Sequence, residues 1–88
     1  MTTSTPAFRE KFLQILRKHV RLVDADEPIP PDQSLVSIGL DSIGTINLLL
    51  ELELAFSVSF PGALLTPETF RTPATLEQTV ASLVRAHD

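Results

Sequence analysis

The sequence predicts an all-α fold: a four-helix bundle with a short third helix and a long loop between the first two helices. Two observations lead to this prediction. Apolar residues recur at helical spacing in three long segments, and each segment starts with a Ser, Thr or Asp whose side-chain oxygen can accept an unpaired backbone N–H. The alternating stretch 57–60, a pattern typical of a strand, is only four residues long and has no partner strand elsewhere in the sequence.

The first helix is expected to run from Pro6 to Val23. Thr5 can serve as its N-cap, and Pro6 suits the first helical position because the N–H that proline lacks would be unpaired there anyway. One face of this segment is apolar and the other is charged, as in an amphipathic helix. The apolar positions are Phe8, Phe12, Ile15, Leu16 and Val20. Residues 1–5, which are mostly small and polar, are expected to be disordered.

A long loop is expected over residues 24–37, because Pro28, Pro30 and Pro31 are incompatible with a regular helix. Loops of this length in small domains often serve a function or are held by apolar anchors of their own. The candidate anchors are Ile29, Leu35 and Ile38. The loop leads to Gly39, whose conformational freedom suits a turn just before the central helix.

The central helix is expected from Ser42 to Phe56, with Asp41 or Ser42 as its N-cap. Its apolar residues form two stripes. The first stripe consists of Thr45, Leu48, Leu49, Leu52 and Phe56. The second consists of Ile43, Ile46, Leu50 and Leu54, with Asn47 and Glu53 beside it. A chain of 88 residues buries only about 60–65% of its unfolded surface, too little to cover both stripes. We therefore expect the first stripe to be core and the second to be a docking face for another molecule.

Two further helices are predicted after the Pro61-Gly62 turn signal. Thr66-Pro67 repeats the N-cap and proline pattern and predicts a short third helix from Pro67 to Arg71. The last helix begins at Thr72-Pro73 or at Thr75, which forms a capping-box pattern with a glutamine three residues later. Its apolar stripe consists of Leu76, Val80, Leu83 and Val84.

Length and composition predict one domain over residues 1–88 and exclude several functions. Because the chain has no apolar run of about 20 residues and no signal peptide, we expect a cytoplasmic protein without a membrane partner. Residues 22–88 hold ten acids and two bases, which argues against nucleic acid and favours partners with basic surfaces. The five bases of residues 1–21 are interpreted as a solvated helix face. No cysteine is present and the two histidines lie far apart, so no metal site is expected.

The residues around the start of the central helix resemble a known family. The pattern is Asp32-x-x-Leu35-x-x-Ile38-Gly39-Leu40-Asp41-Ser42-Ile43, followed by Leu48-x-x-x-Leu52-Glu53-x-x-Phe56-x-Val58-x-Phe60-Pro61. It is similar to the phosphopantetheine-binding carrier proteins of fatty-acid, polyketide and nonribosomal peptide synthesis. The stretch Thr66-Pro67-Glu68-Thr69-Phe70 also looks like this family, and the similarity extends from about Phe8 to Val84.

This resemblance implies that the protein catalyses nothing and that a phosphopantetheinyl transferase attaches 4′-phosphopantetheine from coenzyme A to Ser42. The thiol of the arm would carry cargo as a thioester, and Asp41 would assist recognition by the transferase. An acyltransferase or adenylating enzyme would load the arm, and downstream synthase or condensing enzymes would use the cargo. The expected docking residues are Leu40, Ile43, Ile46, Asn47, Leu50, Glu53, Leu54, Phe70 and Arg71, although Phe70 fits a core position equally well.

The type of carrier is indicated by neutral residues where fatty-acid carriers are often acidic. Gly44, Thr45, Asn47 and Leu54 make electrostatic recognition by fatty-acid enzymes doubtful. The run from Leu40 to Thr45 is more similar to discrete aminoacyl, peptidyl or D-alanyl carrier proteins. We therefore expect a discrete, monomeric carrier of amino-acid-derived cargo in polyketide, nonribosomal peptide or antibiotic biosynthesis.

Three other functions compete with this interpretation. A fatty-acid-type acyl carrier would have the same fold and the same modified serine. A small helical interaction module would share the docking face but need neither a prosthetic group nor Ser42, which would then be only a helix cap. A serine hydrolase is disfavoured, because only His19 and His87 could activate Ser42 and the segment lacks the Gly-x-Ser-x-Gly nucleophile elbow.

Overall fold

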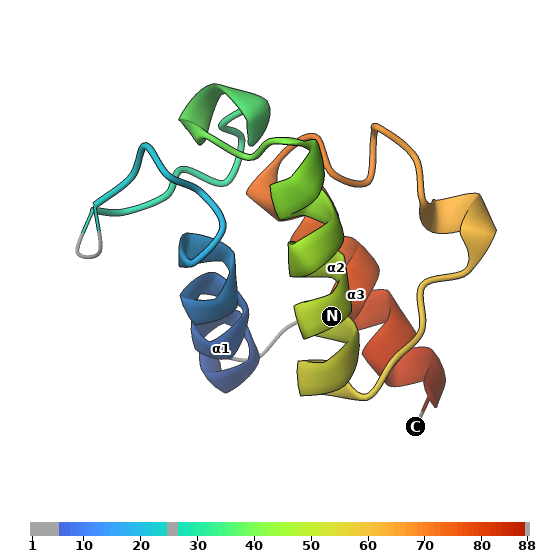
Figure 1. The fold of residues 1–88 in the computed structure, drawn as a ribbon. Helices are drawn as coiled ribbons and strands as arrows, with labels where there is room; N and C mark the ends of the chain where they lie inside the picture. The colour runs from blue at the N-terminus through green and yellow to red at the C-terminus, as the bar shows by residue number, and fades with distance from the viewer. Residues whose placement is uncertain (1–5, 25–26, 88) are drawn as a thin grey trace.

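Three α-helices carry the fold in the computed structural model, which describes residues 6–24 and 27–87 (Figure 1). The elements in order are α1 (Pro6–Arg17), the 3₁₀ turn η1 (Val36–Ile38), α2 (Ser42–Phe56), the 3₁₀ turn η2 (Gly62–Leu64) and α3 (Pro73–His87). No strand occurs in the described ranges. The all-α class predicted from the sequence is confirmed, while the expectation for residues 1–5 lies outside the described residues.

Helix α1 ends at Arg17, six residues before the predicted end at Val23. The N–H groups of Lys18 and His19 donate to carbonyls three residues back, at 3.2 and 2.9 Å, which tightens and closes the helix. Val20 is still buried, so the apolar pattern continues beyond the helix as a packed turn. The early end lets the chain turn and pair with the segment that precedes α2.

The long loop is held down by two of the three predicted anchors, Ile29 and Leu35, which are buried, whereas Ile38 is partly buried. The backbone of the loop also forms hydrogen bonds with residues just before α3 and in its first turn. The N–H of Leu35 donates to the carbonyl of Arg71 at 2.9 Å, and the N–H of Ala74 donates to the carbonyl of Pro31 at 2.9 Å. These bonds fix the second half of the loop, at Pro31 and Leu35, ahead of η1.

The predicted short third helix from Pro67 to Arg71 is a series of turns instead. Thr66 Oγ1 accepts the N–H of Thr69 at 3.3 Å, as a cap would, but no helix follows. Pro73 disfavours helical geometry at the residue before it, which leaves too short a stretch to offset the cost of starting a helix. The helical turn in this part of the chain is η2, which lies just before the predicted position.

The core combines the inner faces of the three helices with buried residues of the loops, among them Leu35. The side chains with no exposed surface include Phe12, Leu16, Leu35, Leu48, Leu52, Leu76 and Val80. On α2, Leu48 and Leu52 belong to the stripe that was predicted to be core, so that assignment is confirmed. Each such side chain contributes about 1.5–3 kcal/mol by leaving water.

Four of the five cations of the N-terminal region, predicted to form a solvated face, are exposed, and Arg17 is partly buried; several of them also contact other elements. Arg9 pairs with a carboxylate on α3 at 2.9 Å, Lys18 pairs with Glu51 on α2 at 2.7 Å, and Lys11 donates to the carbonyl of Ala55 at 2.8 Å. Each contact is worth at most about 1 kcal/mol at the surface. Together they tie α1 to α2 and α3. None of the described helices is long and apolar enough to cross a bilayer.

Candidate functional site at the start of helix α2

Asp41, and not Ser42, is the N-cap of α2. Its backbone is extended, with φ −98° and ψ −176°, and its Oδ1 accepts the N–H of Gly44 at 2.6 Å. Its carbonyl accepts both the N–H and the hydroxyl of Thr45 at 2.8 Å. The sequence is compatible with either Asp41 or Ser42 as the N-cap. The structure shows that Asp41 is the cap, so the hydroxyl of Ser42 is not used for capping.

Ser42 occupies the first helical position and is exposed. Among the described residues its hydroxyl has no hydrogen-bond partner, because the neighbouring aspartate already provides the cap. A hydroxyl at a helix N-terminus lies in a field that favours an attached anion. The position therefore fits a phosphodiester-linked group: the oxygen is accessible, is engaged in no other bond and sits where negative charge is stabilised.

Two glycines make the approach to this position possible. Gly39 has φ +103°, and a Cβ on it would lie 2.7 Å from the backbone nitrogen of Arg21. A Cβ on Gly44 would lie 2.9 Å from Oδ1 of Asp41, which is the capping oxygen itself. Gly39 therefore allows the chain before α2 to pack against the turn after α1, and Gly44 leaves room for the cap.

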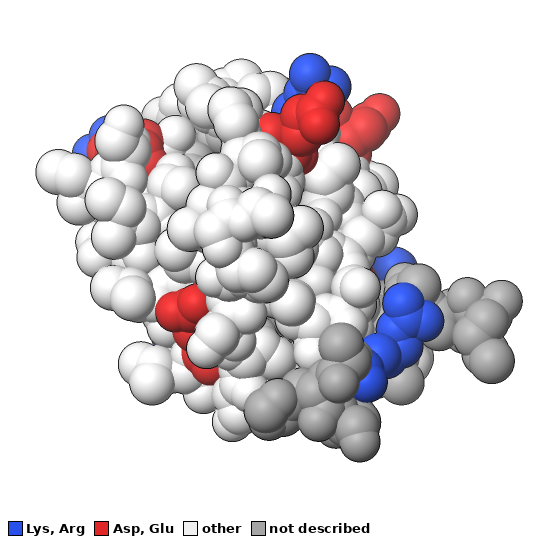
Figure 2. Space-filling view, turned by 90° about the vertical axis from the view of Figure 1, so that its right-hand side faces the viewer, with Lys and Arg blue, Asp and Glu red and all other residues white. Residues whose placement is uncertain are grey.

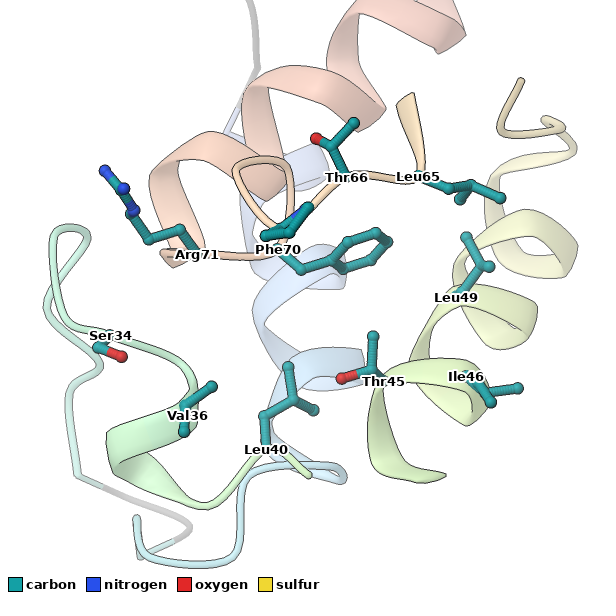
Figure 3. Close-up of a pocket in the computed structure, with 11 residues that line it drawn as sticks. Ser34, Val36, Leu40, Thr45, Ile46, Leu49, Leu65, Thr66, Phe70 and Arg71 are labelled. Carbon is teal, nitrogen blue, oxygen red and sulfur yellow. The ribbon is translucent and has the colours of Figure 1, made fainter. Parts of the chain in front are cut away.

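A groove of about 660 Å³ lies beside the start of α2, between that helix, the turn η1 and residues 65–71. In Figure 3, Leu40, Leu49 and Phe70 point into the hollow, whereas Arg71 points away from it. The lining includes residues on both sides of Ser42 in the sequence, although Ser42 does not line it. The lining residues are Ser34, Val36, Leu40, Thr45, Ile46, Leu49, Leu65, Thr66, Pro67, Phe70 and Arg71.

The second apolar stripe of α2 is exposed, as expected. Its exposed fractions are 72% for Ile43, 58% for Ile46, 52% for Leu50 and 83% for Leu54. Val36 and Leu65, which the sequence did not single out, extend this exposed apolar surface across the groove. Figure 2 shows that the face containing residues 62–72 is mostly uncharged, with its few charged side chains toward the margins.

Five of the expected docking residues do not belong to the exposed apolar stripe of α2. Leu40 is 4% exposed and packs in the core, which corrects its placement on the docking face. Glu53 accepts the N–H of Phe60 through Oε2 at 2.8 Å, so it stabilises the chain after α2. Phe70 is half-buried and stacks on Phe60 with ring centroids 6.0 Å apart. Arg71 is exposed and lines the groove, whereas Asn47 on α2 is exposed but does not line it.

Two contacts of basic residues near the site were not predicted from the sequence. Arg21 Nη2 lies 3.3 Å from Oδ2 of Asp41. His19 Nε2 lies 2.9 Å from Oε1 of Glu51. Hydrogen bonds from Lys18 and His19 hold the pKa of Glu51 below its ordinary value of 4.5. Nothing in the residue pattern indicates these pairs, because they form only when the turn after α1 packs against α2.

Comparison with known proteins identifies the family of this chain. The family described as "phosphopantetheine attachment site" matches residues 10–84. The aminoacyl carrier protein of Agrobacterium fabrum is 33% identical over 67 residues, which cover 76% of this chain and 81% of that protein. Aminoacyl carrier protein 2 of Bradyrhizobium diazoefficiens is 29% identical over 72 residues, which cover 82% of this chain and 81% of that protein.

A solved structure has the same fold. The crystal structure of an engineered Bradyrhizobium japonicum glycine:[carrier protein] ligase, complexed with a carrier protein from Agrobacterium tumefaciens and ATP, contains a chain that matches with a TM-score of 0.73 and 30% identity. The match covers 83% of this chain and 95% of that one. It supports the three-helix arrangement described above.

These matches settle which of the weighed alternatives holds at the level of the family. The chain bears a covalently attached 4′-phosphopantetheine, is the substrate of a phosphopantetheinyl transferase and has no catalytic role of its own. It belongs to the family of phosphopantetheine-binding carrier proteins and is of the aminoacyl carrier type.

Proposed function

We propose that this protein carries an amino acid as a thioester on an arm attached to Ser42 and receives it from an ATP-dependent ligase. The observation that supports this most is the state of Ser42: an exposed hydroxyl, without a hydrogen-bond partner in residues 6–24 and 27–87, at the first position of α2 and beside an apolar groove. The arm supplies a terminal thiol for the cargo. The chain itself supplies the attachment oxygen, the helix that orients it and a surface for the enzymes.

Attachment requires only that Ser42 Oγ be reachable. Its hydroxyl gives up its proton to a base of the transferase, and the oxygen forms a bond to the phosphorus that bears the pantetheine in coenzyme A. The pyrophosphate bond of coenzyme A breaks, and adenosine 3′,5′-bisphosphate leaves. Asp41 holds the backbone of the first turn through Gly44 and Thr45, so the hydroxyl is presented in one place. This fixed position is what a transferase can recognise, and it gives Asp41 the supporting role that the sequence suggested.

The aminoacyl nature of the cargo is supported by the relatives. Two curated relatives are named aminoacyl carrier proteins, and a structural neighbour is a complex of a carrier protein with a glycine:[carrier protein] ligase and ATP. We propose that an enzyme of this ligase class loads the present chain, with glycine or another small amino acid. A fatty-acid-type cargo is disfavoured because residues 42–50 of α2 are uncharged and because Ile43, Ile46 and Leu54 are exposed on this helix.

The docking surface for the loading ligase is proposed to be the exposed stripe of α2 with the two hydrophobic residues across the groove. Its members are Val36, Ile43, Ile46, Leu50, Leu54 and Leu65. It fits an apolar patch on the partner, because all six side chains are large, hydrophobic and exposed. Large exposed apolar patches on a small protein mark interaction sites.

The wider setting is part of the same proposal. We propose that residues 1–88 form a single, monomeric carrier domain that acts in the cytoplasm, where coenzyme A and ATP are available. Downstream synthase or condensing enzymes, as in polyketide or nonribosomal peptide biosynthesis, would take the amino acid from the arm. The acidic balance of residues 22–88 supports contacts with basic rims around an apolar centre.

The test is aminoacylation of the arm-bearing protein. The protein is first treated with a phosphopantetheinyl transferase and coenzyme A, and then with a glycine:[carrier protein] ligase, ATP and glycine. Intact mass is expected to show one glycyl group, lost on treatment with hydroxylamine. No transfer with any of a panel of amino acids, together with efficient acyl transfer by fatty-acid enzymes, would contradict the aminoacyl proposal.

The docking surface is tested in the same assay with a matched pair of variants. Leu54→Glu places a charge in the stripe, whereas Leu22→Glu makes the same change at a leucine that is 71% exposed but lies outside it. The proposal expects a higher KM of the ligase for Leu54→Glu alone. If both changes raise the KM equally, or if neither changes it, the stripe is not the docking surface.

A further inference from the structure

We propose that Arg21 is a positioning residue for the prosthetic arm: the guanidinium that pairs with Asp41 binds the phosphodiester formed at Ser42. This inference rests on the proposed attachment at Ser42 and adds a residue that the sequence did not suggest. It comes from the turn after α1, twenty-one positions before the serine in the sequence.

Arg21 is held beside the start of α2 by its backbone. The N–H of the next residue, Leu22, donates to the carbonyl of Ile38 at 3.0 Å. The turn at Gly39 packs so closely that a Cβ there would lie 2.7 Å from the nitrogen of Arg21 and 3.3 Å from its Cα. Two backbone contacts therefore fix where the Arg21 side chain starts, independently of where its guanidinium points.

The guanidinium itself is adjacent to the attachment position. Arg21 Nη2 lies 3.3 Å from Oδ2 of Asp41, and the Cα atoms of Asp41 and Ser42 are about 3.8 Å apart as consecutive residues. The side chain of Arg21 is 74% exposed and that of Asp41 is 52% exposed. The guanidinium can therefore turn from one residue to the next without leaving a buried site.

Attachment changes the balance of charge at this point. The unmodified chain has one negative group here, Asp41, and its Oδ1 is already used by the helix cap. A phosphodiester on Ser42 adds a second negative group next to it, which repels the first and competes for Arg21. A planar guanidinium with several donors matches phosphate oxygens well and binds them through paired hydrogen bonds.

The other basic groups of the region are placed differently. Lys18 and His19 both contact Glu51, at 2.7 and 2.9 Å. Arg71 points away from the hollow of the groove in Figure 3. Arg21 is the base that the described structure pairs with the neighbour of Ser42. A contact from Arg21 to the phosphodiester would fix the first atoms of the arm and set the direction in which the rest leaves α2.

The experiment compares four proteins in the arm-bearing form by ³¹P NMR: the wild type, Arg21→Gln, Arg21→Lys and Arg85→Gln. Arg85→Gln removes the same charge from the last turn of α3, whose C-terminal end lies at the opposite end of the bundle from the start of α2 (Figure 1). The phosphodiester shift of the wild type is expected to depend on salt, because an exposed pair is screened as ionic strength rises. Arg21→Gln should abolish that dependence, Arg21→Lys should keep part of it, and Arg85→Gln should leave it unchanged.

The pair is exposed, so its strength is expected to correspond to a factor of up to about five in occupancy. Intact mass spectrometry distinguishes a failure of arm attachment at Ser42 from a failure of the proposed role of Arg21. If the wild type takes up no arm at Ser42, both this inference and the proposed function are overturned. If all four proteins take up the arm and Arg21→Gln retains the shift and salt dependence of the wild type, the role of Arg21 alone is overturned.

Discussion

Replacement of Asp41 separates its two contacts, because alanine and asparagine remove different parts of the side chain. Oδ1 accepts the N–H of Gly44 at 2.6 Å, and Oδ2 faces Arg21 at 3.3 Å. Asp41→Ala removes both contacts. Asp41→Asn keeps an oxygen that can cap α2, since asparagine is as good an N-cap as aspartate, but it removes the charge.

The expected magnitudes follow from these distances and exposures. Loss of the cap costs about 1 kcal/mol. Loss of the ion pair costs only about 0.3 kcal/mol, because both side chains are more than half exposed. Asp41→Ala should therefore lower the free energy of unfolding by about 1.3 kcal/mol, and Asp41→Asn by about 0.3 kcal/mol. For a domain of this size the first value corresponds to a fall in Tm of roughly 5–10 °C.

The assay is urea unfolding followed by circular dichroism, with the thermal midpoint measured in parallel. The account is refuted if Asp41→Asn destabilises the protein as much as Asp41→Ala, because the charge and not the cap would then hold α2. It is also refuted if Asp41→Ala unfolds at the same urea concentration as the wild type.

Three further predictions concern packing and pH, each with a measurement of the free energy of unfolding. Gly39→Ala should destabilise the protein by about 1–3 kcal/mol, because φ is positive there and the new Cβ would meet the backbone of Arg21. Gly62→Ala, whose Cβ would have open space around it, should be neutral or slightly stabilising. Equal effects of the two changes would contradict this. Leu52→Ala should cost about 2–5 kcal/mol and Leu54→Ala less than about 0.5 kcal/mol, because the first is buried and the second exposed on the same helix; reversed costs would show that the wrong stripe had been assigned to the core. Glu51 has a lowered pKa in the folded chain, so its contribution to stability is present above pH 4.5 and is lost as the pH falls through the folded pKa. In an unfolding series from about pH 7 to about pH 3, the Glu51→Gln variant should therefore lose less stability than the wild type. Parallel curves of unfolding free energy against pH would refute this.

Helix α2 was predictable from sequence in both bounds and orientation. Asp41 marks its start. A chain this small can bury only one of the two apolar stripes of the helix, and this limit was enough to assign Leu52 to the core and Leu54 to the surface. The motif around Ser42 indicated the family, and comparison with known proteins confirmed it.

The errors have physical causes that a linear pattern does not show. The apolar pattern beyond Arg17 is real, since Val20 is buried, but it continues in a turn because backbone contacts with Ile38 and Gly39 compete with helix there. The third helix failed because Pro73 limits the stretch before it. Contacts across long separations, such as that of Arg21 with Asp41, depend on the packed turn and have no signature in residue spacing.

The central claim is that Ser42 bears the arm, and intact mass spectrometry tests it most directly. Wild type, Ser42→Ala and Ser59→Ala, a change at another exposed serine, are incubated with coenzyme A, Mg²⁺ and a phosphopantetheinyl transferase, after circular dichroism has shown that all three are folded. The account predicts a gain of one phosphopantetheine on wild type and on Ser59→Ala and no gain on Ser42→Ala. A gain on folded Ser42→Ala, or none on the folded wild type, would contradict it.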